Sequence, residues 1–444
     1  MQALWAEEQQ RLPGVRVDLS YGMISLGSTV LWSVLSGWLL YFYLPPEGEG
    51  RPLVPAALLG VALFANRVVD AVIDPPIGYL SDRTHSRWGR RLPFMAASAL
   101  PMLVFFVLLW APPVRGESVW NLVYLVVILE LYNVAYSFLH IAHGALLPEL
   151  ALSDRHRVRV SAWKAGLETV GMVLGAFVGL VIERVGYVRM ALVYAVAMLP
   201  LFYAPLFVLR ERPERQIAPA RRLGFWSSLL STRQNRAFLI YTLTWALYWG
   251  TMTLVPAAIP FIATEICLLT KADTVYFYLS SILVSVICYP LVARLADRMG
   301  KWRVFVVSLL TSALVLAGLT LIGSWFPVPL KVQGIVWIVF QAATLSGALV
   351  LSSVFAAEVT DYDERLTGQR REGIYYATWG LLDNVVSGAA TALVPMLLLL
   401  GRSHSDPHGP LGVRLIGVVG GAMLLAASLI FLHYPHRLGP DQGA

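Results

Sequence analysis

Residues 53–80 read LVPAALLGVALFANRVVDAVIDPPIGYL, an apolar stretch whose charged residues are Arg67, Asp70 and Asp74. A helix needs about 20 largely apolar residues to cross a bilayer, so this stretch is long enough to span one. A charged side chain costs about 3 kcal/mol or more at the bilayer centre, and it therefore faces a bundle interior or water. The stretch predicts a membrane-spanning helix whose charged face has a function.

The rest of the chain has the same character. Of its 444 residues, 57% are hydrophobic and 14% are charged, and the mean hydropathy is +0.65. Soluble domains have about 25% charged residues, so this composition excludes a soluble globule and a disordered chain. The first apolar run is too long for a cleaved signal peptide. The sequence predicts an all-α membrane protein of twelve transmembrane helices, near residues 19–44, 53–80, 93–112, 119–148, 160–182, 187–209, 237–262, 272–294, 303–324, 331–357, 373–400 and 411–433.

The formal net charge of +7 comes from basic residues in short loops between the apolar runs. Loops of this size between membrane spans exclude nucleic acid as a partner. With the N-terminus in the cytoplasm, most of the 34 Lys and Arg residues fall on the cytoplasmic side, as the positive-inside rule requires. We therefore expect both termini in the cytoplasm of a plasma (inner) membrane protein. The two cysteines, Cys267 and Cys288, do not form a disulfide framework.

The longest cytoplasmic connection, residues 210–236, divides the chain near its middle. It separates six runs in residues 1–209 from six runs in residues 237–444. A weak repeat supports this division, because Gly78-Tyr-Leu-Ser-Asp82-Arg83 follows the second run and Ala293-Arg-Leu-Ala-Asp297-Arg298 follows the eighth. Duplicated six-helix halves are the architecture of major facilitator transporters, in which the substrate path lies between the halves.

Both Asp-Arg pairs stand at the end of a span. An acid and an arginine in that place can clamp a neighbouring helix in one state of a rocking cycle. Topology signalling by basic loops alone is the alternative interpretation. The residues that we expect to act in gating are Asp82, Arg83, Arg87, Arg90, Arg91, Asp297 and Arg298.

Asp70 and Asp74 lie four residues apart on one face of the second span, and Arg67 lies on the same stripe. Two clustered carboxylates repel each other and need a cation, a proton or the arginine to coexist. Pro75 and Pro76 remove the hydrogen bonds to the carbonyls of residues 71 and 72. The pattern indicates a site of hard oxygen ligands for Na⁺ or a proton. A static ion pair between Arg67 and the acids is the alternative.

Two later spans carry paired polar residues. His140 and His143 lie three residues apart on the fourth span, where neutral histidines bind substrate, shuttle a proton or complete a cation site. A satisfied interior histidine is the alternative, and a zinc site would lack further ligands. Lys164 and Glu168 lie four residues apart on the fifth span. They form a simple salt bridge or meet a substrate headgroup.

The eleventh run contains adjacent polar residues, Asp383 and Asn384, of which one can face an interior cavity directly. Tryptophans such as Trp245, Trp249 and Trp379 fit membrane belts or cavity walls, and we expect most of them to be structural.

The motif Arg67-Val-Val-Asp70-Ala-Val-Ile-Asp74-Pro75, running on to Asp82-Arg83-Thr-His-Ser-Arg87-Trp-Gly-Arg90-Arg91, resembles the glycoside–pentoside–hexuronide:cation symporters of the major facilitator superfamily. That family includes melibiose permease and the sodium-dependent lysophosphatidylcholine symporter. The resemblance spans nearly the whole chain. Further matching motifs are Leu19-Ser-Tyr-Gly22, Leu147-Pro148-Glu149-Leu150, Asp361-Tyr-Asp363-Glu364 and Thr367-Gly-Gln-Arg370-Arg371-Glu372-Gly373.

The resemblance implies roles for individual residues. It places Asp70 and Asp74 at the family's cation carboxylates, with His140 nearby. From the span patterns and the resemblance together, the residues that we expect to bind substrate are Thr29, Arg67, His143, Lys164, Glu168 and Asn384. Thr29 and His140 stand where the sugar carrier has aspartates, Asn384 stands where the family usually has a lysine, and Ile73 replaces an asparagine beside the cation. His140 and Glu168 instead match the lysolipid carrier.

We therefore expect a secondary active transporter that works by alternating access as a symporter coupled to Na⁺ or H⁺, with a sugar or glycoside as its small solute. A transporter of lysophospholipids or other amphipaths is the first alternative, and a non-transporting membrane receptor or scaffold is the second. An enzyme is not expected, because no nucleophile motif accompanies the histidines. We expect no cofactor, no metal beyond Na⁺, and a chain that functions as a monomer in the lipid bilayer.

Overall fold

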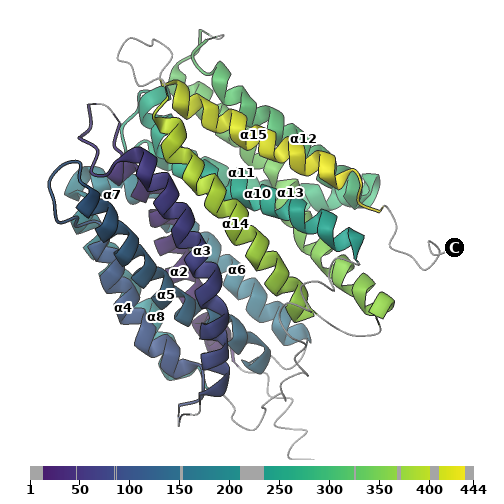
Figure 1. Ribbon diagram of the computed structural model, residues 1–444. Coiled ribbons are helices and arrows are strands. Elements are labelled where there is room, and N and C mark those ends of the chain that lie inside the picture. The colour runs from purple at the N-terminus through teal and green to yellow at the C-terminus, as the bar shows by residue number, and fades with distance from the viewer. Residues whose placement is uncertain are drawn as a thin grey trace, which may run out of the picture. The chain divides into compact units, whose positions relative to one another are not determined.

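The computed structural model describes residues 14–46, 48–84, 86, 88–150, 154–210, 235–324, 327–367, 372–400 and 410–435. Within these residues the regular secondary structure is helical and includes no strand (Figure 1). A π-helix, η2 (Ile262–Ile266), continues α10, and a 3-10 helix, η3 (Gly318–Leu321), continues α12. The α-helices are α2 (Val15–Tyr43), α3 (Ala56–Arg83), α4 (Leu92–Leu108), α5 (Val119–Leu150), α6 (Asp154–Ala176), α7 (Val178–Val185), α8 (Tyr187–Val208), α10 (Arg236–Phe261), α11 (Thr274–Met299), α12 (Lys301–Ala317), α13 (Leu330–Thr367), α14 (Glu372–Leu398) and α15 (Leu411–Phe431).

The helices match the predicted membrane spans one by one. Eleven segments of the described residues are long and apolar enough to cross a membrane, and α4, with 17 residues, is a shorter apolar helix. Helices α6 and α7 together make one of the eleven, Arg155–Val185. The prediction of an all-helical chain with apolar membrane-spanning segments is therefore confirmed for the described residues.

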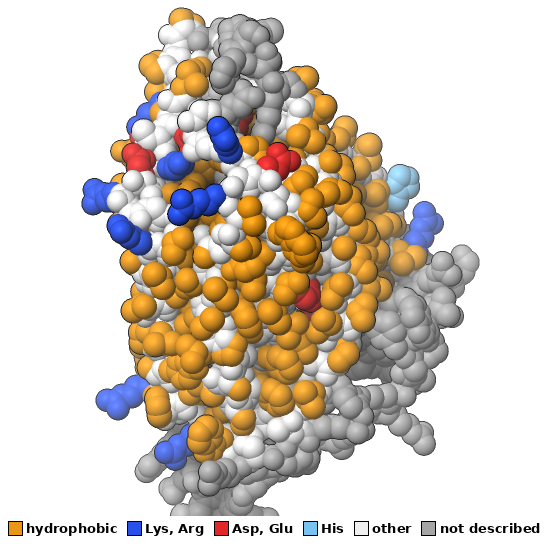
Figure 2. Space-filling view, turned by 60° about the vertical axis from the view of Figure 1, so that its left-hand side comes forward, with side chains coloured by type: hydrophobic (Ala, Val, Ile, Leu, Met, Phe, Trp, Pro, Cys, Tyr) orange, Lys and Arg blue, Asp and Glu red, His pale blue; other side chains and the backbone are white. Residues whose placement is uncertain are grey.

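Apolar side chains dominate the face of the molecule that Figure 2 shows. Most of the Lys, Arg, Asp and Glu side chains on this face gather towards its two ends. Many of the exposed side chains along the helices are large and apolar, such as Phe207 at 86% and Leu314 at 74% exposure. Lipid tails suit such a surface, because there is no hydrophobic cost to placing apolar side chains against them.

The chain divides into two units. The first comprises Met1–Leu35, Val72–Arg115 and Val123–Ala218, and the second comprises Ser36–Ala71, Gly116–Leu122 and Pro219–Ala444. The division falls inside α2, α3 and α5, so each of these helices contributes one part to each unit. The predicted halves, 1–209 and 237–444, stay a prediction. Most of the predicted connection 210–236 lies outside the described residues.

In the first unit, small residues let α2 and α6 approach closely. A Cβ atom added at Gly171 would lie 2.9 Å from the Leu26 carbonyl oxygen, and one added at Gly175 would lie 2.5 Å from the Ser33 Cβ. Small residues at helix contacts are typical of membrane proteins, where close backbone approach provides the packing energy. Helix α4 packs against α8 in the same unit. The packing thus fixes α2 against α6, which carries Lys164 and Glu168.

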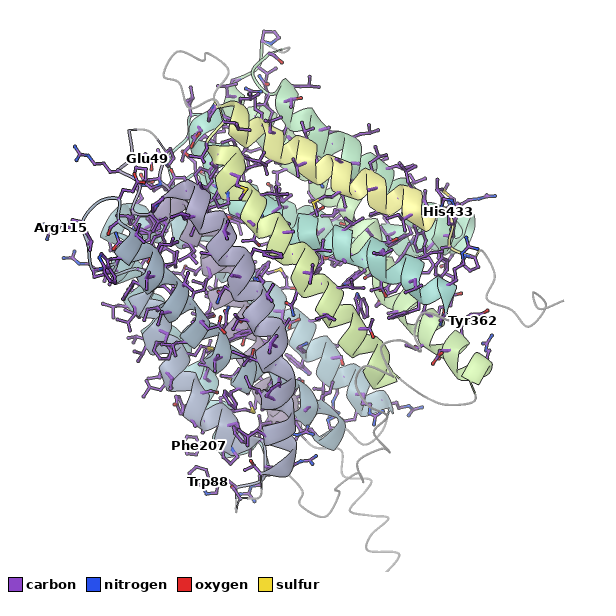
Figure 3. All side chains as sticks on the ribbon, in the orientation of Figure 1. Glu49, Trp88, Arg115, Phe207, Tyr362 and His433 are labelled. Carbon is purple, nitrogen blue, oxygen red and sulfur yellow. The ribbon has the colours of Figure 1, made fainter. Side chains whose placement is uncertain are left out.

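The two ends of the first unit carry different connections. Trp88 and Phe207 lie at one end, and Arg115 lies at the other (Figure 3).

At the N-terminal ends of α2 and α6, fully buried Asp18 pairs with buried His156 at 2.8 Å and with Arg159. This ion-paired cluster holds the two helix ends together.

In the second unit, α10 packs against α14 and α15, α11 against α13, and α12 against α13 and α15. Buried Arg414 of α15 donates hydrogen bonds to the carbonyl oxygens of Thr320 and Ile322, at 2.7 and 2.9 Å. Glu49 lies at one end of this unit, and Tyr362 and His433 lie at the other (Figure 3). An aromatic core lies towards the latter end, with ring centroids 4.5 to 5.4 Å apart, and consists of Phe305, Phe355, Phe431 and Tyr434.

Candidate functional site

In its apolar part, helix α3 carries three charged residues, Arg67, Asp70 and Asp74, within about two turns. Arg67 Nη1 lies 3.8 Å from Asp70 Oδ2, within ion-pair distance but beyond that of a hydrogen bond. The Asp70 side chain is 11% exposed and that of Arg67 is 40% exposed. The pair is thus one buried carboxylate under a guanidinium that keeps an open side. For Asp70, this contact is the ion pair with Arg67 that the sequence analysis gave as its alternative. Both residues belong to the second unit.

Asp74, one turn further along α3, has a different environment. Ser137 of α5 donates a hydrogen bond of 2.6 Å to Asp74 Oδ1, and the carboxylate is half-buried. Within the described part of the chain, Asp74 makes no ion pair. Short hydrogen bonds of hydroxyl to carboxylate are strong, so Ser137 fixes the orientation of the carboxylate, which also interacts electrostatically with His140.

Ser137 is a site residue that the sequence analysis missed. It precedes His140 by three residues, and this spacing places both side chains on neighbouring parts of one face of α5. That spacing was the available signal. A lone serine in an apolar run is too common to stand out without the carboxylate that it contacts.

The two histidines of α5 have different surroundings. His140 stacks on the Tyr136 ring with a centroid distance of 5.2 Å, and its Nδ1 lies 3.4 Å from the Tyr136 hydroxyl. His143 is buried, stacks on the Tyr21 ring at 4.0 Å, and places Nε2 3.0 Å from the Tyr21 carbonyl oxygen. A carbonyl only accepts, so Nε2 of His143 carries the proton in this contact. His143 thereby links α5 to α2, whereas His140 retains a more open position.

Lys164 and Glu168 of α6 form a salt bridge of 3.4 Å, and their side chains are 36% and 34% exposed. The simple salt bridge of the sequence analysis is therefore present. Its partial exposure leaves both groups able to meet a ligand. On α2, Thr29 is half-buried against α6, because a Cβ at Gly171 would lie 3.1 Å from the Thr29 Cβ.

Polar residues of α14 face α3 within the second unit. Ser387 donates a 3.4 Å hydrogen bond to Asp383, whose carboxylate also interacts electrostatically with Arg67. Asn384 is half-buried beside Asp383. The helices are close here, because a Cβ at Gly388 would lie 3.0 Å from the Arg67 Cβ. The second unit thus brings together Arg67, Asp70 and Asp383, and Asp383 was not among the predicted substrate residues.

The predicted gating residues are placed only in part. Asp82 and Arg83 belong to the last turn of α3, but their side chains and the whole of Arg87 lie outside the described residues. Arg90 precedes α4, and Arg91 is its buried N-cap residue. Asp297 and Arg298 are exposed near the end of α11. The described residues include no group of three or more His, Cys, Asp or Glu side chains that could hold a metal ion.

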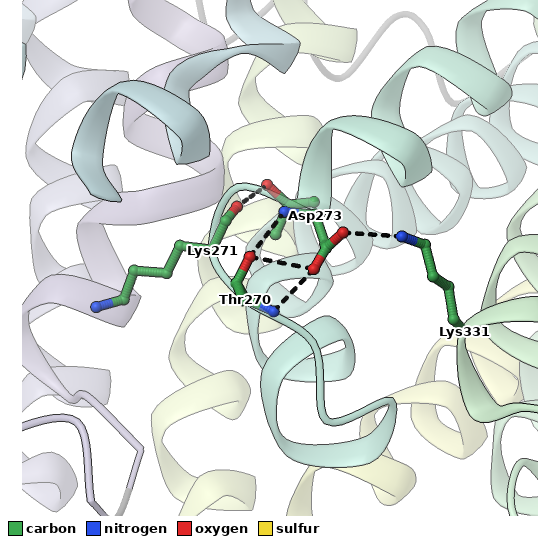
Figure 4. A network of polar contacts seen from close by, with 5 residues as sticks. Thr270, Lys271, Asp273 and Lys331 are labelled. Carbon is green, nitrogen blue, oxygen red and sulfur yellow. Dashed lines mark hydrogen bonds and ion pairs between the residues drawn. The ribbon is translucent and has the colours of Figure 1, made fainter. Parts of the chain in front are cut away.

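A polar network that the sequence analysis did not predict surrounds the connection between α10 and α11 (Figure 4). Asp273 accepts a hydrogen bond from Lys331 of α13 at 2.9 Å and two from Thr270. These bonds, chiefly that from Lys331, hold the pKa of Asp273 below its ordinary value. Lys271 points the other way and pairs with Glu49 at 2.8 Å. The connection is therefore tied on both sides by ion pairs.

The chain is similar over most of its length to known membrane transporters. The sequence profile of the MFS/sugar transport protein family matches residues 20–434. The isoprimeverose transporter of Lactiplantibacillus pentosus is 25% identical over 84% of this chain and 78% of that protein. An uncharacterized symporter of Synechocystis sp. is 35% identical, but the alignment spans 35% of this chain and 29% of the relative.

Two further similarities concern other solutes. The sodium-dependent lysophosphatidylcholine symporter 1-A of Danio rerio is 30% identical over 31% of this chain and 25% of that protein. Among solved structures, a mutant of the nucleoside transporter NupG superimposes with a TM-score of 0.66 at 13% identity, over 94% of this chain and 99% of that one. At that identity, the structural likeness shows the fold alone.

Proposed function

Because the chain belongs to the MFS/sugar transport protein family, we propose that it moves a small solute, a sugar or glycoside, together with Na⁺ or H⁺ by alternating access. Membership of this family makes the chain a multi-pass membrane transporter rather than an enzyme. The identity of the solute and the coupling to a cation are the parts that we propose.

The observation that carries the proposal is the carboxylate of Asp74. It stands in an apolar helix, is held by Ser137, and makes no ion pair within the described residues. An uncompensated carboxylate at membrane depth is costly, so it binds a proton or a cation or faces water. A scaffold has little use for such a group, whereas a symporter needs a site that binds and releases a cation.

The two acids of α3 suit linked binding. Asp70 already faces Arg67 at 3.8 Å, so the net negative charge of the stripe falls on Asp74. A cation at Asp70 and Asp74, with His140 close by, relieves the repulsion between the carboxylates. If substrate binds better to that relieved state, the cation also binds better when substrate is present, because such coupling is reciprocal.

For the solute, the partly exposed groups are the ones able to make contacts. Lys164 and Glu168 offer charges of both signs on α6, and Arg67 keeps an open side on α3. We propose that these groups, with Thr29 and Asn384, bind the hydroxyls of a sugar. His143, buried against Tyr21, holds α5 in place for this site.

A lysophospholipid or other amphipathic solute is the second candidate. The similarity to the lysophosphatidylcholine symporter favours it, at 30% identity over 142 residues. The residues His140 and Glu168, which resemble that carrier, favour it as well. A zwitterionic headgroup would then take the place of the sugar at Lys164 and Glu168.

We propose a plasma membrane location with both termini in the cytoplasm. The basis is the excess of basic residues in the corresponding loops. Asp82, Arg83, Arg87, Arg90, Arg91, Asp297 and Arg298 are proposed to act at the cytoplasmic end, where their loops would clamp neighbouring helices during the cycle. We further propose that one chain suffices for transport.

The test is the thermal stability of the purified protein in a Na⁺ series at two pH values, with glycosides or lysophospholipids added. A ligand that binds the folded state raises stability by about 2.7 kcal/mol at a hundred times its dissociation constant. We expect the melting temperature to rise with Na⁺ or to shift with pH. We expect the increase in melting temperature to become larger when a glycoside is added. In Asp70→Asn and Asp74→Asn we expect no such increase.

The matched control is Glu117→Gln, which neutralises an exposed acid in the α4–α5 connection. It should keep the full cation response. Stabilisation by lysophospholipid and not by glycoside would show that the solute is a lysophospholipid, the second candidate. A wild-type protein that responds to neither cation, pH nor solute would refute the symporter and support a non-transporting scaffold.

A further inference from the structure

Three tryptophans of the second unit form one continuous surface. The sequence analysis expected most of the tryptophans to be structural. Trp245 and Trp249 of α10 stack with ring centroids 5.5 Å apart and an interplanar angle of 14°. Trp379 of α14 meets Trp245 edge-on, at 5.2 Å and 64°. We call Trp245, Trp249 and Trp379 the indole surface. Trp249 is 36% exposed, so part of its side chain stays accessible.

The indole surface lies on the side of α10 that points away from α15. The α15 side of α10 is marked by Thr244, whose hydroxyl lies 3.4 Å from the Ala427 carbonyl oxygen, and by Thr251 and Leu254, which lie against Gly420. Residues 245 and 249 are one turn apart on a different stripe of the helix. The accessible part of Trp249 is therefore not needed for packing α10 against α15.

The polar residues of α14 stand at the same level as Trp249. Trp245 meets Trp379, and a Cβ at Gly250 would lie 3.1 Å from Val386. Since both helices rise 1.5 Å per residue and the two contacts have nearly the same sequence offset, α10 and α14 run parallel. Trp249 thus lies level with Asp383 and its neighbour Asn384.

Asp383 also reaches the charged stripe of α3. Its carboxylate interacts electrostatically with Arg67, and Gly388, five residues further along α14, packs against the Arg67 side chain. The exposed apolar residues Val385 and Leu393 mark a separate, lipid-facing side of α14. Asp383 therefore interacts with the guanidinium of Arg67 and stands one turn after Trp379, which belongs to the indole surface.

We propose that the indole surface is a stacking subsite for the sugar ring of a glycoside, with Asp383, Asn384 and Arg67 as its polar edge. The inference rests on the proposed function and deepens it. The C–H face of a pyranose ring is apolar and lies flat on the accessible part of Trp249. The ring's hydroxyls then meet a carboxylate that accepts hydrogen bonds and a guanidinium that donates them. Apolar walls with a few convergent polar groups are typical of small-molecule sites.

The shape of the indole surface favours a sugar ring over a choline headgroup. A quaternary ammonium is bound by aromatic rings that enclose it. Trp245 and Trp249 instead stack on each other and present one flat face. The polar edge carries both a donor and an acceptor, as the alternating hydroxyls of a sugar need.

The experiment measures binding of methyl and 4-nitrophenyl glycosides to the purified full-length protein, by thermal stabilisation over a concentration series in saturating Na⁺ and at low pH. We expect Trp249→Leu to weaken binding of the preferred glycoside at least tenfold and Trp249→Phe, which keeps a ring, to weaken it less. Trp120→Leu removes a 73% exposed tryptophan at the start of α5 and is the matched control, which should bind as the wild type does. The cation response of each variant, measured without glycoside, reports that its fold and cation site are intact.

Wild-type glycoside affinity in Trp249→Leu, with the cation response retained, would overturn the stacking subsite and leave the symporter standing. Loss of the cation response in Asp74→Asn alongside that result would confirm that the symporter stands independently. A wild-type protein that binds lysophosphatidylcholine and none of the glycosides would overturn the subsite together with the proposed solute class.

Discussion

At the residue scale, the contact that most constrains the site is the hydrogen bond from Ser137 to Asp74, at 2.6 Å. A hydrogen bond to a charged group contributes about 1.5–3 kcal/mol. We expect Ser137→Ala to raise the cation concentration, or shift the pH, that gives half-maximal stabilisation by roughly one to two orders of magnitude. Ser137→Thr keeps the hydroxyl and should behave almost as the wild type. The melting temperature is measured over a Na⁺ series and over a pH series. Equal responses of Ser137→Ala and the wild type would contradict the prediction.

A second residue-scale prediction concerns pH and the Asp273–Lys331 pair (Figure 4). The pKa of Asp273 is lowered by the hydrogen bond from Lys331, so folding favours its ionised form. Its contribution to stability is therefore present above the ordinary aspartate pKa and is lost as the pH falls through the folded value. Asp273→Asn should lower the melting temperature at neutral pH, and the difference from the wild type should shrink below about pH 4.

The measurement for that pair is a melting-temperature series from pH 7 to pH 3 for both proteins. Glu117→Gln, at an exposed acid, is the control and should show no such difference. A gap between Asp273→Asn and the wild type that widens with falling pH would refute the assignment.

At the element scale, tight helix contacts depend on single glycines. A Cβ added at Gly347 of α13 would lie 1.9 Å from Ser308 Oγ and 3.0 Å from its Cβ on α12. We expect Gly347→Ala to destabilise the protein by about 1–3 kcal/mol, as overpacking does. Gly166 in α6 has no neighbour within 4 Å of such an atom, so Gly166→Ala should be neutral or stabilising by about 0.5–1 kcal/mol. Thermal melting of both variants tests this prediction. Equal changes in melting temperature for Gly347→Ala and Gly166→Ala would contradict the packing argument.

The elements were predicted well where hydropathy sets them and less well at their ends. Each of the twelve apolar runs is a helix or a pair of helices, because membrane depth leaves backbone groups no other partners. The run 331–357 belongs to a longer helix, Leu330–Thr367, since its polar extension is no longer limited by lipid. The break at Phe177 between α6 and α7 and the π-helix Ile262–Ile266 have no signal in hydropathy, because both lie inside continuous apolar runs.

The candidate site was predicted from the sequence only in part. Asp70, Asp74 and Arg67 stand out because charges in an apolar run are costly. Ser137 and the indole surface do not, because a serine or a tryptophan is cheap anywhere in a membrane helix. Asp383 does stand out with its neighbour Asn384, but which of the two faces the site depends on how α14 is turned. Their significance comes from cross-helix neighbours, which one sequence does not encode as spacing.

At the scale of the whole molecule, transport by alternating access requires one end of the protein to open while the other closes. The Lys271–Glu49 pair joins the first predicted half of the sequence to the second, and Tyr41 adds a 2.7 Å hydrogen bond to Glu49 and a 3.1 Å bond to Thr264. The Asp273–Lys331 pair lies within the second half alone. If the two predicted halves separate at this end, as the proposed alternating access requires, the first pair breaks and the second stays intact.

Buried Cys267 directly follows the π-helix, lies beside Gly334 of α13 and stands four residues before Lys271. It therefore reports local opening of the connection between α10 and α11 that the Lys271–Glu49 pair holds. Burial raises the pKa of its thiol to about 12, and the reactive form is the thiolate, so Cys267 is inert while this end is closed. Glu49→Gln removes the charge but keeps an acceptor for Tyr41. A partly exposed pair is worth about 0.2–1 kcal/mol, so in a Cys288→Ser background the variant should be labelled by a thiol reagent up to about fivefold faster. Glu117→Gln should not change the rate, and a Glu49→Gln rate equal to that of the parent would show that the pair does not hold this end closed.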